Sequence, residues 1–547
     1  MSKPAGRLGR NYRVMWDQNS GMECYYNPPM TPEKVAQAHV GFFEGAPVDA
    51  YVCALGANAG YSVGYPTKVK NMECYFDRLD DPEVKIGDVQ HWRHAVNLKT
   101  LFDAGIDPLQ VVLDECKRIE VDFWGRLSMN DWHHSNEEGE GVNLMGSRFA
   151  ERAELFIGKD GVDPDWPEFI RETTAVFQDF AHDEVRQLRM DVAAEFCERY
   201  DADGFLYDFM RCPGLFKYKE IENNRPLLTG LIRDTRTAFD EIAKKRGRPI
   251  GLAVRVPNTI SGARNLGCDV PAWIAEDLVD IVIPSTFFHA DLEEDISEWA
   301  DLARNTPVRI IPAFEEGYAC GHTGGITRGF YHPPIMLPLT VDMIQAIAAR
   351  HWKNGADGMY VFNWFSTGHT FDFDNRPALD TMANPLRLKY LNKRYVMMRT
   401  DASFPNCLPH PRQIPVKLTE DPVTVTINVA DDLKEAGERV KRVQLHVHLS
   451  NLRVIDRLEV AVNGQDLACT NPMKPGAYNT KRTAWQNYDL AVDQVTCGDN
   501  EVSLRIVGRD SRLARQLPVA VEDIELAIEY DYPDGPWYSP PGFVPRT

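Results

Sequence analysis

Carboxylates stand at the ends of two short apolar runs in this sequence. Asp208 ends the run that starts at Asp203, and Glu315 and Glu316 follow the apolar stretch that starts at Val308. Two carboxyl groups on either side of a glycosidic bond can hydrolyse it, because one protonates the leaving oxygen while the other attacks the sugar or activates water. Strand alternation turns one of two adjacent glutamates inward. We therefore predict a catalytic pair of Asp208 with Glu315 or Glu316.

The roles within this pair depend on the surroundings of each carboxyl group. Arg211, three residues after Asp208, should favour the ionised carboxylate, which suits a nucleophile or base. The proton donor would then be the glutamate, whose pKa the neighbouring Phe314 and Tyr318 could raise. The opposite assignment is left open. Asp131 is the alternative partner of Asp208 if both glutamates point outward.

Other predicted strand ends carry residue types that bind sugars. Tryptophan faces stack on sugar rings, and Asn, Asp, Arg and His side chains form hydrogen bonds with hydroxyl groups. The predicted substrate-binding residues are Arg126, Asn130, Asp131, Trp132, His133, Arg211, Arg255, His289, Asn363 and Trp364, with Asp17 as a weaker candidate. The arginines could pair with a uronate or a sulfate, and pairing with Asp208 or Asp131 explains them equally well.

The elements that would position these residues alternate over the N-terminal part of the chain. Apolar strands separated by helical patterns indicate a parallel sheet buried on both faces. Eight such strands favour a closed barrel over an open sheet, so we predict an α/β fold with a (β/α)8 TIM barrel and its site at the carboxyl ends of the strands. The strands begin near Tyr12, Val48, Val121, Asp203, Ile250, Val279, Val308 and Gly358, and the clearest helices are Pro108–Ile119 after the N-cap Asp107, Asp183–Tyr200, Pro226–Lys245 and Val341–Lys353.

The pattern changes after residue 400. Prolines between residues 405 and 415 mark a linker over 401–415, and short strands with alternating hydrophobicity follow. We predict a catalytic barrel over 1–400 and an antiparallel β-sandwich over 416–547, with a hairpin turn at Asn463-Gly464. Trp485, Tyr488 and Trp537 could bind carbohydrate there, although a packed scaffold is the simpler interpretation. The predicted strands are Val423–Val429, Arg442–Leu449, Arg457–Val462, Glu501–Val507 and Asp523–Tyr530.

Composition limits the partners of this chain. Its 547 residues carry a formal net charge of −20, which repels phosphate backbones and anionic lipids, so neither nucleic acid nor a membrane is an expected partner. Residues 1–13 lack the apolar core of a signal peptide, so we expect a cytoplasmic protein or an exported one whose signal has been removed. The 11 cysteines form no CxxC pair and are expected to be free thiols.

Around these residues the chain resembles the glycosyl-hydrolase-like family 10 proteins, bacterial barrels grouped with family 10 glycosylhydrolases. The likeness covers most of the first domain. It implies carbohydrate hydrolysis by the barrel. That family commonly has two adjacent acidic residues at the end of strand four, whereas here Phe209 follows Asp208, which makes strand seven the better place for the partner carboxylate. The matching blocks are Val185-Arg186, Arg199-Tyr200-Asp201, Asp203-Gly204 and Asp208, with weaker ones at Asp107-Pro108-Leu109, Val121–Gly125, Leu278–Pro284 and Gly355–Gly358.

The sequence thus predicts a glycoside hydrolase that cleaves an oligo- or polysaccharide by paired-carboxylate catalysis. One alternative is a metal-dependent or acid–base sugar lyase or isomerase that uses His133 and His289. Another is a non-catalytic carbohydrate-binding barrel. Metal ligation by these histidines and His322 is conceivable, but there is no HExxH spacing, so we expect no metal and no cofactor. The sugar, the linkage and the oligomeric state are left open.

Overall fold

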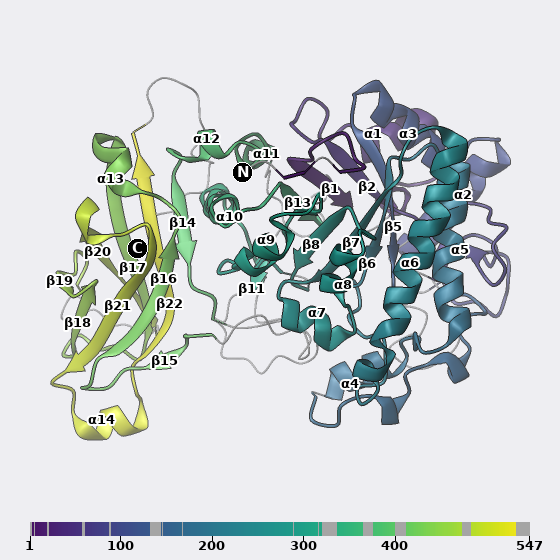
Figure 1. Ribbon diagram of the computed structural model, residues 1–547. Coiled ribbons are helices and arrows are strands. Elements are labelled where there is room, and N and C mark those ends of the chain that lie inside the picture. Colours follow the sequence, from purple (N-terminus) through teal and green to yellow (C-terminus); the bar gives the residue numbers. More distant parts are fainter. Residues whose placement is uncertain are drawn as a thin grey trace.

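The structure of the chain is a computed structural model. It describes residues 3–4, 6–18, 21–56, 61–86, 89–131, 144, 146–166, 168–287, 289–315, 317–319, 336–364, 376–399, 412–472 and 483–531. Of the predicted site residues, Trp132, His133 and Glu316 lie outside this set. A curled parallel sheet covered by helices lies beside a group of antiparallel strands (Figure 1).

The parallel sheet contains nine strands in the order β10-β13-β1-β2-β5-β6-β7-β8-β9. All its neighbouring strands pair in parallel. The predicted strands are confirmed, each beginning within two residues of its predicted start. The bounds are β1 Val14–Gln18, β2 Ala50–Ala54, β5 Asp122–Ser128, β6 Gly204–Asp208, β7 Gly251–Pro257, β8 Ile281–Ser285, β9 Arg309–Ile310, β10 Ala313–Glu315 and β13 Met359–Phe362.

The predicted seventh strand is split into β9 and β10 by Ile311 and Pro312. Proline has no N–H to donate, which interrupts a strand locally. β9 pairs with β8, and β10 pairs with β13 at the other end of the sheet order. Ile311 N–H donates to Val282 O (3.0 Å), and Tyr360 N–H donates to Pro312 O (2.9 Å). The sheet is therefore curled so far that consecutive residues reach both of its edges.

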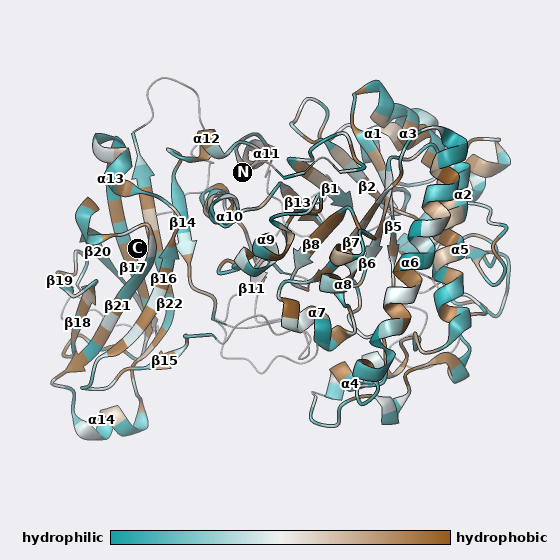
Figure 2. Ribbon diagram, viewed as in Figure 1, coloured by the Kyte–Doolittle hydropathy of each residue, from teal (hydrophilic) through white to brown (hydrophobic). Residues whose placement is uncertain are grey.

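The two faces of the curled sheet form separate cores. Outward-facing side chains pack against the helices, whereas inward-facing ones pack against one another inside the curl. Figure 2 shows the brown, hydrophobic strands in the centre and teal residues on the outer sides of the helices. On five strands, the inward-facing residue that lies two positions after an apolar core residue is charged. These charged positions are Asp17, Arg126, Asp208, Arg255 and Glu315, and all lie at or near the carboxyl ends of their strands.

The helices cover the outside of the sheet (Figure 1). Three predicted helices are confirmed as α3, α5 and α10, and Asp107 caps α3 by accepting the N–H groups of Leu109 and Gln110. α6 begins five residues before the predicted start, because a proline in the second turn removes only one hydrogen bond. Within the described residues, no helix is long and apolar enough to cross a membrane. The bounds are α1 Pro32–His39, α2 Val89–Asp103, α3 Pro108–Arg118, α4 Glu168–Ala175, α5 Asp183–Arg199, α6 Ile221–Arg246, α7 Ile260–Leu266, α8 Val270–Ala275, α9 Ser297–Ala303, α10 Val341–Lys353, α11 Arg376–Met382 and α12 Pro385–Leu388.

The basic N-terminal segment lies at the opposite end of the sheet, where the strands begin. Its arginines pair with aspartates at or just before the first residues of three strands. The segment therefore links strands that are distant in the sequence. The pairs are Arg7–Asp280 at 3.2 Å, Arg10–Asp122 at 2.7 Å and Arg13–Asp49 at 2.9 Å.

The C-terminal part contains two antiparallel sheets that share one hydrophobic core. One has the order β14-β22-β17-β20 with β15 beside β22, and the other has the order β16-β21-β18-β19. The five predicted strands are confirmed, and β20 was missed because one of its faces is largely polar. The bounds are β14 Lys393–Val396, β15 Val416–Lys417, β16 Val423–Val429, β17 Val440–Ser450, β18 Arg457–Val462, β19 Gln465–Leu467, β20 Thr483–Leu490, β21 Gly498–Val507 and β22 Ala520–Tyr530, with the short helices α13 Leu433–Ala436 and α14 Ser511–Gln516.

Local features of this part test two further predictions. Asn463 (φ 49°) and Gly464 (φ 77°) form the predicted hairpin turn between β18 and β19, since a two-residue turn of this kind needs positive φ at both positions. Tyr488, named from the sequence as a residue that could bind carbohydrate, is not exposed. Its ring is buried in the shared core, and its hydroxyl donates to Gln486 (2.7 Å). Trp485 is half-buried and stacks on His448 (centroids 4.7 Å apart), while Trp537 lies outside the described residues.

Candidate active site

Five charged side chains form one chain of ion pairs inside the curled sheet. Arg126 on β5 contacts Asp17 on β1 (Nε–Oδ2 2.9 Å) and Asp208 on β6 (Nη1–Oδ2 3.0 Å). Arg255 on β7 contacts the same Asp208 oxygen (Nη1–Oδ2 3.3 Å) and Glu315 on β10 (Nη2–Oε1 3.2 Å). All five residues are buried. Three carboxyl groups thus share two guanidinium groups, with Asp208 in the centre.

Asp208 has hydrogen-bonding partners on both oxygens. Oδ1 accepts the backbone N–H groups of Met210 and Arg211, both at 2.9 Å, and Oδ2 faces the two arginines. A carboxylate has about four acceptor positions, so these four contacts use its capacity. Arg211 was expected to act on Asp208 through its charge. What the structure adds is a backbone contact, because the chain turns back over the carboxylate directly after β6.

Glu315 has longer contacts and a perturbed pKa. Its Oε1 accepts from Arg255 at 3.2 Å, and its Oε2 accepts from Asn363 Nδ2 at 3.4 Å. Burial raises the pKa of Glu315 to about 7, and the positive charge of Arg255 opposes this only in part. Glu315 can therefore keep a proton near neutral pH, as a general acid must. The prediction that one of the adjacent glutamates faces inward is confirmed for Glu315.

Asp17 is the third carboxyl group of the chain of ion pairs. Its Oδ2 accepts a hydrogen bond from the Tyr360 hydroxyl and contacts Arg126. Its Oδ1 has no hydrogen-bond donor in the described part of the chain. Burial raises the pKa of Asp17 to about 6, against the opposing charge of Arg126. Asp17 was only a weaker candidate from the sequence, and Tyr360 was missed. The signal available was strand parity, since both side chains alternate inward with apolar neighbours.

The two arginines of this site, Arg126 and Arg255, form ion pairs with carboxylates. Arg126 and Arg255 each bridge two of them, and their guanidinium groups lie 5.5 Å and 3.8 Å from the ring centroid of Phe362. Arg255 also donates to Ser285 Oγ (2.9 Å). The structure therefore favours the alternative stated from the sequence, pairing with Asp208, over recognition of a uronate or sulfate by these two residues.

Asn130 and Asp131 follow the carboxyl end of β5 and are fully buried. The Asn130 side-chain amide donates to the carbonyl oxygens of Gln178 (2.8 Å) and Gly214 (2.7 Å), and its oxygen accepts from the Tyr61 hydroxyl (2.6 Å). The same hydroxyl lies 2.9 Å from the backbone oxygen of Asp131. Asn130 thus fastens three loop segments together, which the sequence could not show because its partners lie far along the chain.

Trp364 and His289 also pack inside the protein. The Trp364 ring lies edge-on to Trp16 (6.2 Å) and contacts Phe314 (5.7 Å), so it is part of the core and does not offer an open stacking face. His289 is fully buried, with Nδ1 2.8 Å from Phe287 O. Of the predicted binding residues, Arg126 and Arg255 belong to the chain of ion pairs itself. Asn363 contacts it through Glu315, and the Arg211 backbone contacts it through Asp208.

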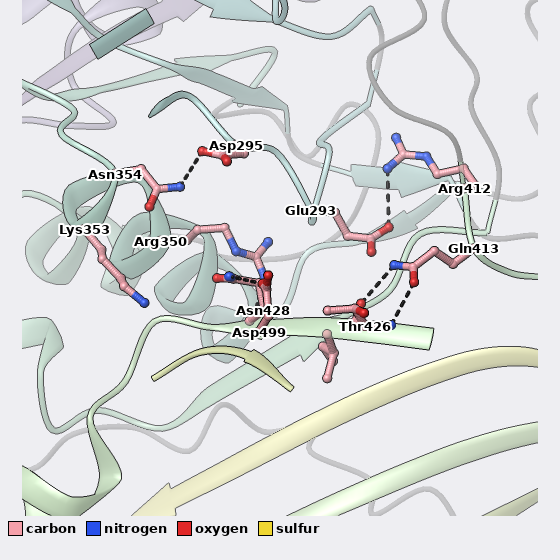
Figure 3. Close-up of a pocket in the computed structure, with 11 residues that line it drawn as sticks. Glu293, Asp295, Arg350, Lys353, Asn354, Arg412, Gln413, Thr426, Asn428 and Asp499 are labelled. Atoms are coloured by element: carbon pink, nitrogen blue, oxygen red, sulfur yellow. Dashed lines mark hydrogen bonds and ion pairs between the residues drawn. The ribbon is translucent and has the colours of Figure 1, made fainter. Parts of the chain in front are cut away.

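A cavity of about 380 Å³ lies elsewhere, between the parallel-sheet unit and the antiparallel sheets (Figure 3). Many of its polar side chains bond to one another, as Asn354 does to Asp295 (2.8 Å) and Arg412 to Glu293 (3.4 Å). Arg350 crosses the boundary and donates to Asn428 O (2.8 Å). These contacts make the cavity a polar seam between the two units. We therefore place the candidate active site at the strand ends.

No protein family model matches the sequence, and no curated protein matches it. Similar solved structures include the endo-β-1,4-mannanase of Thermotoga petrophila (9% identity, 95% of this chain and 99% of that chain, TM-score 0.40). Another is the PgaB (BpsB) glycoside hydrolase domain of Bordetella bronchiseptica (12% identity, 69% of this chain and 99% of that chain, TM-score 0.39). A third is a family GH18 chitinase of Chromobacterium violaceum (9% identity, 90% of this chain and 88% of that chain, TM-score 0.34). These three similar structures are glycoside hydrolases, and the narrower resemblance to the glycosyl-hydrolase-like family 10 proteins stays a prediction.

Proposed function

We propose that this protein hydrolyses a glycosidic bond in an oligo- or polysaccharide with carboxyl groups at the ends of its parallel strands. The observation that carries the proposal is the buried set of three carboxyl groups around two arginines. Hydrolysis needs one protonated and one unprotonated carboxyl group in the same site. Glu315, with a pKa raised by burial to about 7, meets the first requirement, and it acts as the proton donor.

The proposal includes the finer architecture predicted from the sequence. We infer a closed (β/α)8 barrel over 1–400, a linker over 401–415 and a β-sandwich over 416–547. Closure is supported by the backbone bonds of Ile311 and Pro312 to opposite edges of the sheet. The shared core of the two antiparallel sheets supports the sandwich, to which β14 also contributes by pairing with β22.

Asp208 with Glu315 is the pair predicted from the sequence, and both residues belong to the proposed site. The four contacts of Asp208 suit a supporting role, in which it orients Arg126 and Arg255. The arginines in turn hold the outer carboxyl groups at a fixed distance. Removing Asp208 should therefore lower the rate whether or not its oxygens react.

A substrate panel tests the reaction class. The purified protein is incubated with neutral and acidic polysaccharides and with 4-nitrophenyl and 2,4-dinitrophenyl glycosides, each with and without a chelator. We expect new reducing ends that form equally well with the chelator. Unsaturated products or sensitivity to the chelator would point to the lyase or isomerase, and binding without turnover would point to a carbohydrate-binding barrel.

The role of Glu315 is tested by a comparison of leaving groups. Glu315→Gln should lower the rate on an unactivated glycoside by roughly 10²–10⁴-fold and leave the 2,4-dinitrophenyl glycoside much less affected, because dinitrophenolate departs without a proton. Glu184→Gln, at an exposed pair with Arg152, is the matched control and should change neither rate. Equal losses on both substrates would remove Glu315 from the role of proton donor.

Wild-type activity should also fall as the pH rises through about 7, where Glu315 loses its proton. The groups that face Glu315 are the charged Arg255 and Arg211 and the amide of Asn363, and all three favour its ionised form. A rate that stays constant from pH 6 to pH 9 would contradict a proton donor with this pKa.

A further inference from the structure

Asp17 differs from Asp208 in the contacts of its oxygens. Within the described residues, no group donates a hydrogen bond to Asp17 Oδ1, although the side chain is fully buried. Asp208 has four contacts on its two oxygens. A carboxylate that acts as a base needs a free lone pair directed at its substrate. Asp17 has such a lone pair, and Asp208 has its acceptor positions in use.

Strand register places Asp17 at the same level of the sheet as Glu315, the proposed proton donor, with one strand between them. Asp17 on β1 pairs with Phe362 on β13, and Phe362 pairs with Glu315 on β10. The two acidic residues therefore lie at one level of the sheet, two strand spacings or about 10 Å apart at the backbone. Carboxyl groups that flank a glycosidic bond with a water between them need a wide separation, roughly 6.5–9.5 Å. An intervening strand with the Phe362 ring inside the curl is consistent with such a gap.

Further buried polar atoms belong to residues that directly follow Asp17 and Phe362 in the sequence. The side-chain amide of Gln18, the Oδ1 of Asn363 and the Nε1 of Trp364 are buried and form no hydrogen bond to the described part of the chain. Gln18 follows Asp17 at the end of β1, and Asn363 follows the last residue of β13, its neighbour in the sheet. Buried polar atoms nearly always have partners in folded proteins. Asn363 belongs to the site, since its side chain also contacts Glu315 (3.4 Å), and its Oδ1 can accept a hydrogen bond from water or from a hydroxyl group of a ligand.

We propose that Asp17 is the second catalytic carboxylate of this site, acting as the base on water, and that Asp208 is a positioning residue. This assignment rests on the proposed glycoside hydrolysis. Asp17 Oδ1 takes one proton from a water molecule while the water oxygen forms a bond to the anomeric carbon. The bond from that carbon to the glycosidic oxygen breaks, and Glu315 gives its proton to the leaving oxygen. Asp17 then releases its proton to solvent and Glu315 takes one up.

The groups around Asp17 support this role. Arg126, Tyr360, Arg255 and Asp208 face Asp17 from four other strands of the sheet, and burial outweighs their combined effect in setting the pKa of Asp17 at about 6. A base with this pKa and an acid with a pKa of about 7 give a narrow pH optimum between the two values. The mechanism also predicts that the first product has the inverted anomeric configuration, because water attacks from the face opposite the leaving group.

Azide rescue separates Asp17 from Asp208. Each is changed to Ala, and turnover of a 2,4-dinitrophenyl glycoside cleaved by the wild type is measured with and without sodium azide. We expect Asp17→Ala to lose roughly 10²–10⁴-fold in rate and to regain at least about tenfold with azide, which needs no base. Azide forms a C–N bond as dinitrophenolate leaves, so the product is a glycosyl azide. Asp208→Ala should not be rescued, and Asp49→Asn, at the other end of the sheet, should keep the wild-type rate.

A milder variant covers the case in which Asp17→Ala does not fold. The Tyr360 hydroxyl lowers the pKa of Asp17, so Tyr360→Phe should move the lower limb of the pH–rate profile to higher pH. Asp208→Asn should move the upper limb to lower pH, because Arg255 then acts more strongly on Glu315. A purely structural role would move neither limb.

The outcomes distinguish this assignment from the proposed function. An active wild type whose Asp208→Ala variant forms the azide adduct, while Asp17→Ala does not, overturns the assignment alone. If proton NMR shows that the first product keeps the anomeric configuration of the substrate, the role of Asp17 as a base is overturned. A wild type that cleaves no glycoside in the panel overturns the proposed function itself and this assignment with it.

Discussion

The two ends of the parallel sheet both carry arginine–carboxylate pairs, but the pairs differ in burial and in origin. Where the strands begin, Arg13 comes from the N-terminal segment and pairs with Asp49, and the arginine side chain is 54% exposed. Where the strands end, Arg255 is 1% exposed, and both of its carboxylate partners, Asp208 and Glu315, lie on strands of the same sheet. The arginine side chains are thus partly in water at one end and away from water at the other.

This difference decides what each network can do. A pair with an exposed arginine is screened by water and typically contributes ~0–1 kcal/mol. In the buried set, three carboxyl groups face only two arginines, so full ionisation would leave an excess negative charge away from water. Burial disfavours this charge, and the pKa of Glu315 and of Asp17 therefore rises. The pairs where the strands begin form a brace between distant strands. The network where the strands end holds Glu315 and Asp17 with pKa values close to neutral pH. Four predictions test this contrast, in order of expected size.

Removing Arg255 should have the largest effect on stability. Arg255→Met leaves Asp208 and Glu315 without one of their buried cations, which typically costs about 3–5 kcal/mol of unfolding free energy. Chemical denaturation measures this loss, and Arg13→Met at the exposed end is the matched control. A loss below about 1 kcal/mol in both variants would mean that the two ends do not differ in kind.

Stability should depend on pH through Glu315. Its pKa is about 7 in the folded protein and 4.5 as an ordinary value, so the folded state holds the proton more tightly. The stabilisation is complete below about pH 4.5 and is lost as the pH rises to about 7, a change of roughly 3 kcal/mol. Glu315→Gln cannot titrate. The stability difference between wild type and variant, measured at pH 4.5 and pH 7.5, should shift in favour of the variant at the higher pH. An unchanged difference would contradict the raised pKa.

A carboxylate at the other end should affect stability without affecting catalysis. Asp49 accepts the backbone N–H groups of Arg13 (2.7 Å) and Val14 (3.3 Å) and is 6% exposed. Asp49→Asn weakens these bonds and the ion pair, so we expect a loss of ~1–3 kcal/mol in unfolding free energy. Thermal and chemical unfolding give this value, and kcat/KM on the best substrate of the panel should stay at the wild-type level. Lost activity in a folded variant would remove the distinction between brace and active site.

The smallest effect is expected for an exposed pair of the brace. Arg7 contacts Asp277 at 2.7 Å, with side chains 26% and 58% exposed, and Asp280 at 3.2 Å. Arg7→Gln should cost less than ~1 kcal/mol, and less still at high salt, because water and ions screen the Arg7–Asp277 pair and the buried Asp280 keeps its pair with Arg236 (3.1 Å). Unfolding at two salt concentrations checks this. A loss as large as that of Arg255→Met would show that burial is not the deciding variable.

The sequence by itself determined the order and type of the main elements. Short apolar runs predicted the parallel strands to within two residues, because a strand buried on both faces must be apolar along most of its length. Asp107 predicted the start of α3 and Asn463-Gly464 the β18–β19 turn, since capping and turn residues act on their immediate neighbours. Strand parity also predicted that a glutamate after β9 would face inward.

Only the tertiary structure decided which charged residues work together. Asp17 and Glu315 are almost three hundred residues apart, and their common partner Phe362 follows from the order in which the strands pair. The use of both Asp208 oxygens and the free Oδ1 of Asp17 depend on contacts with other strands and turns. Burial of the arginines then separates the brace from the site, because the energy of a charge depends on the solvent that its neighbours exclude. The candidate carboxylates can be identified from the sequence, whereas the fold determines which of them holds a proton.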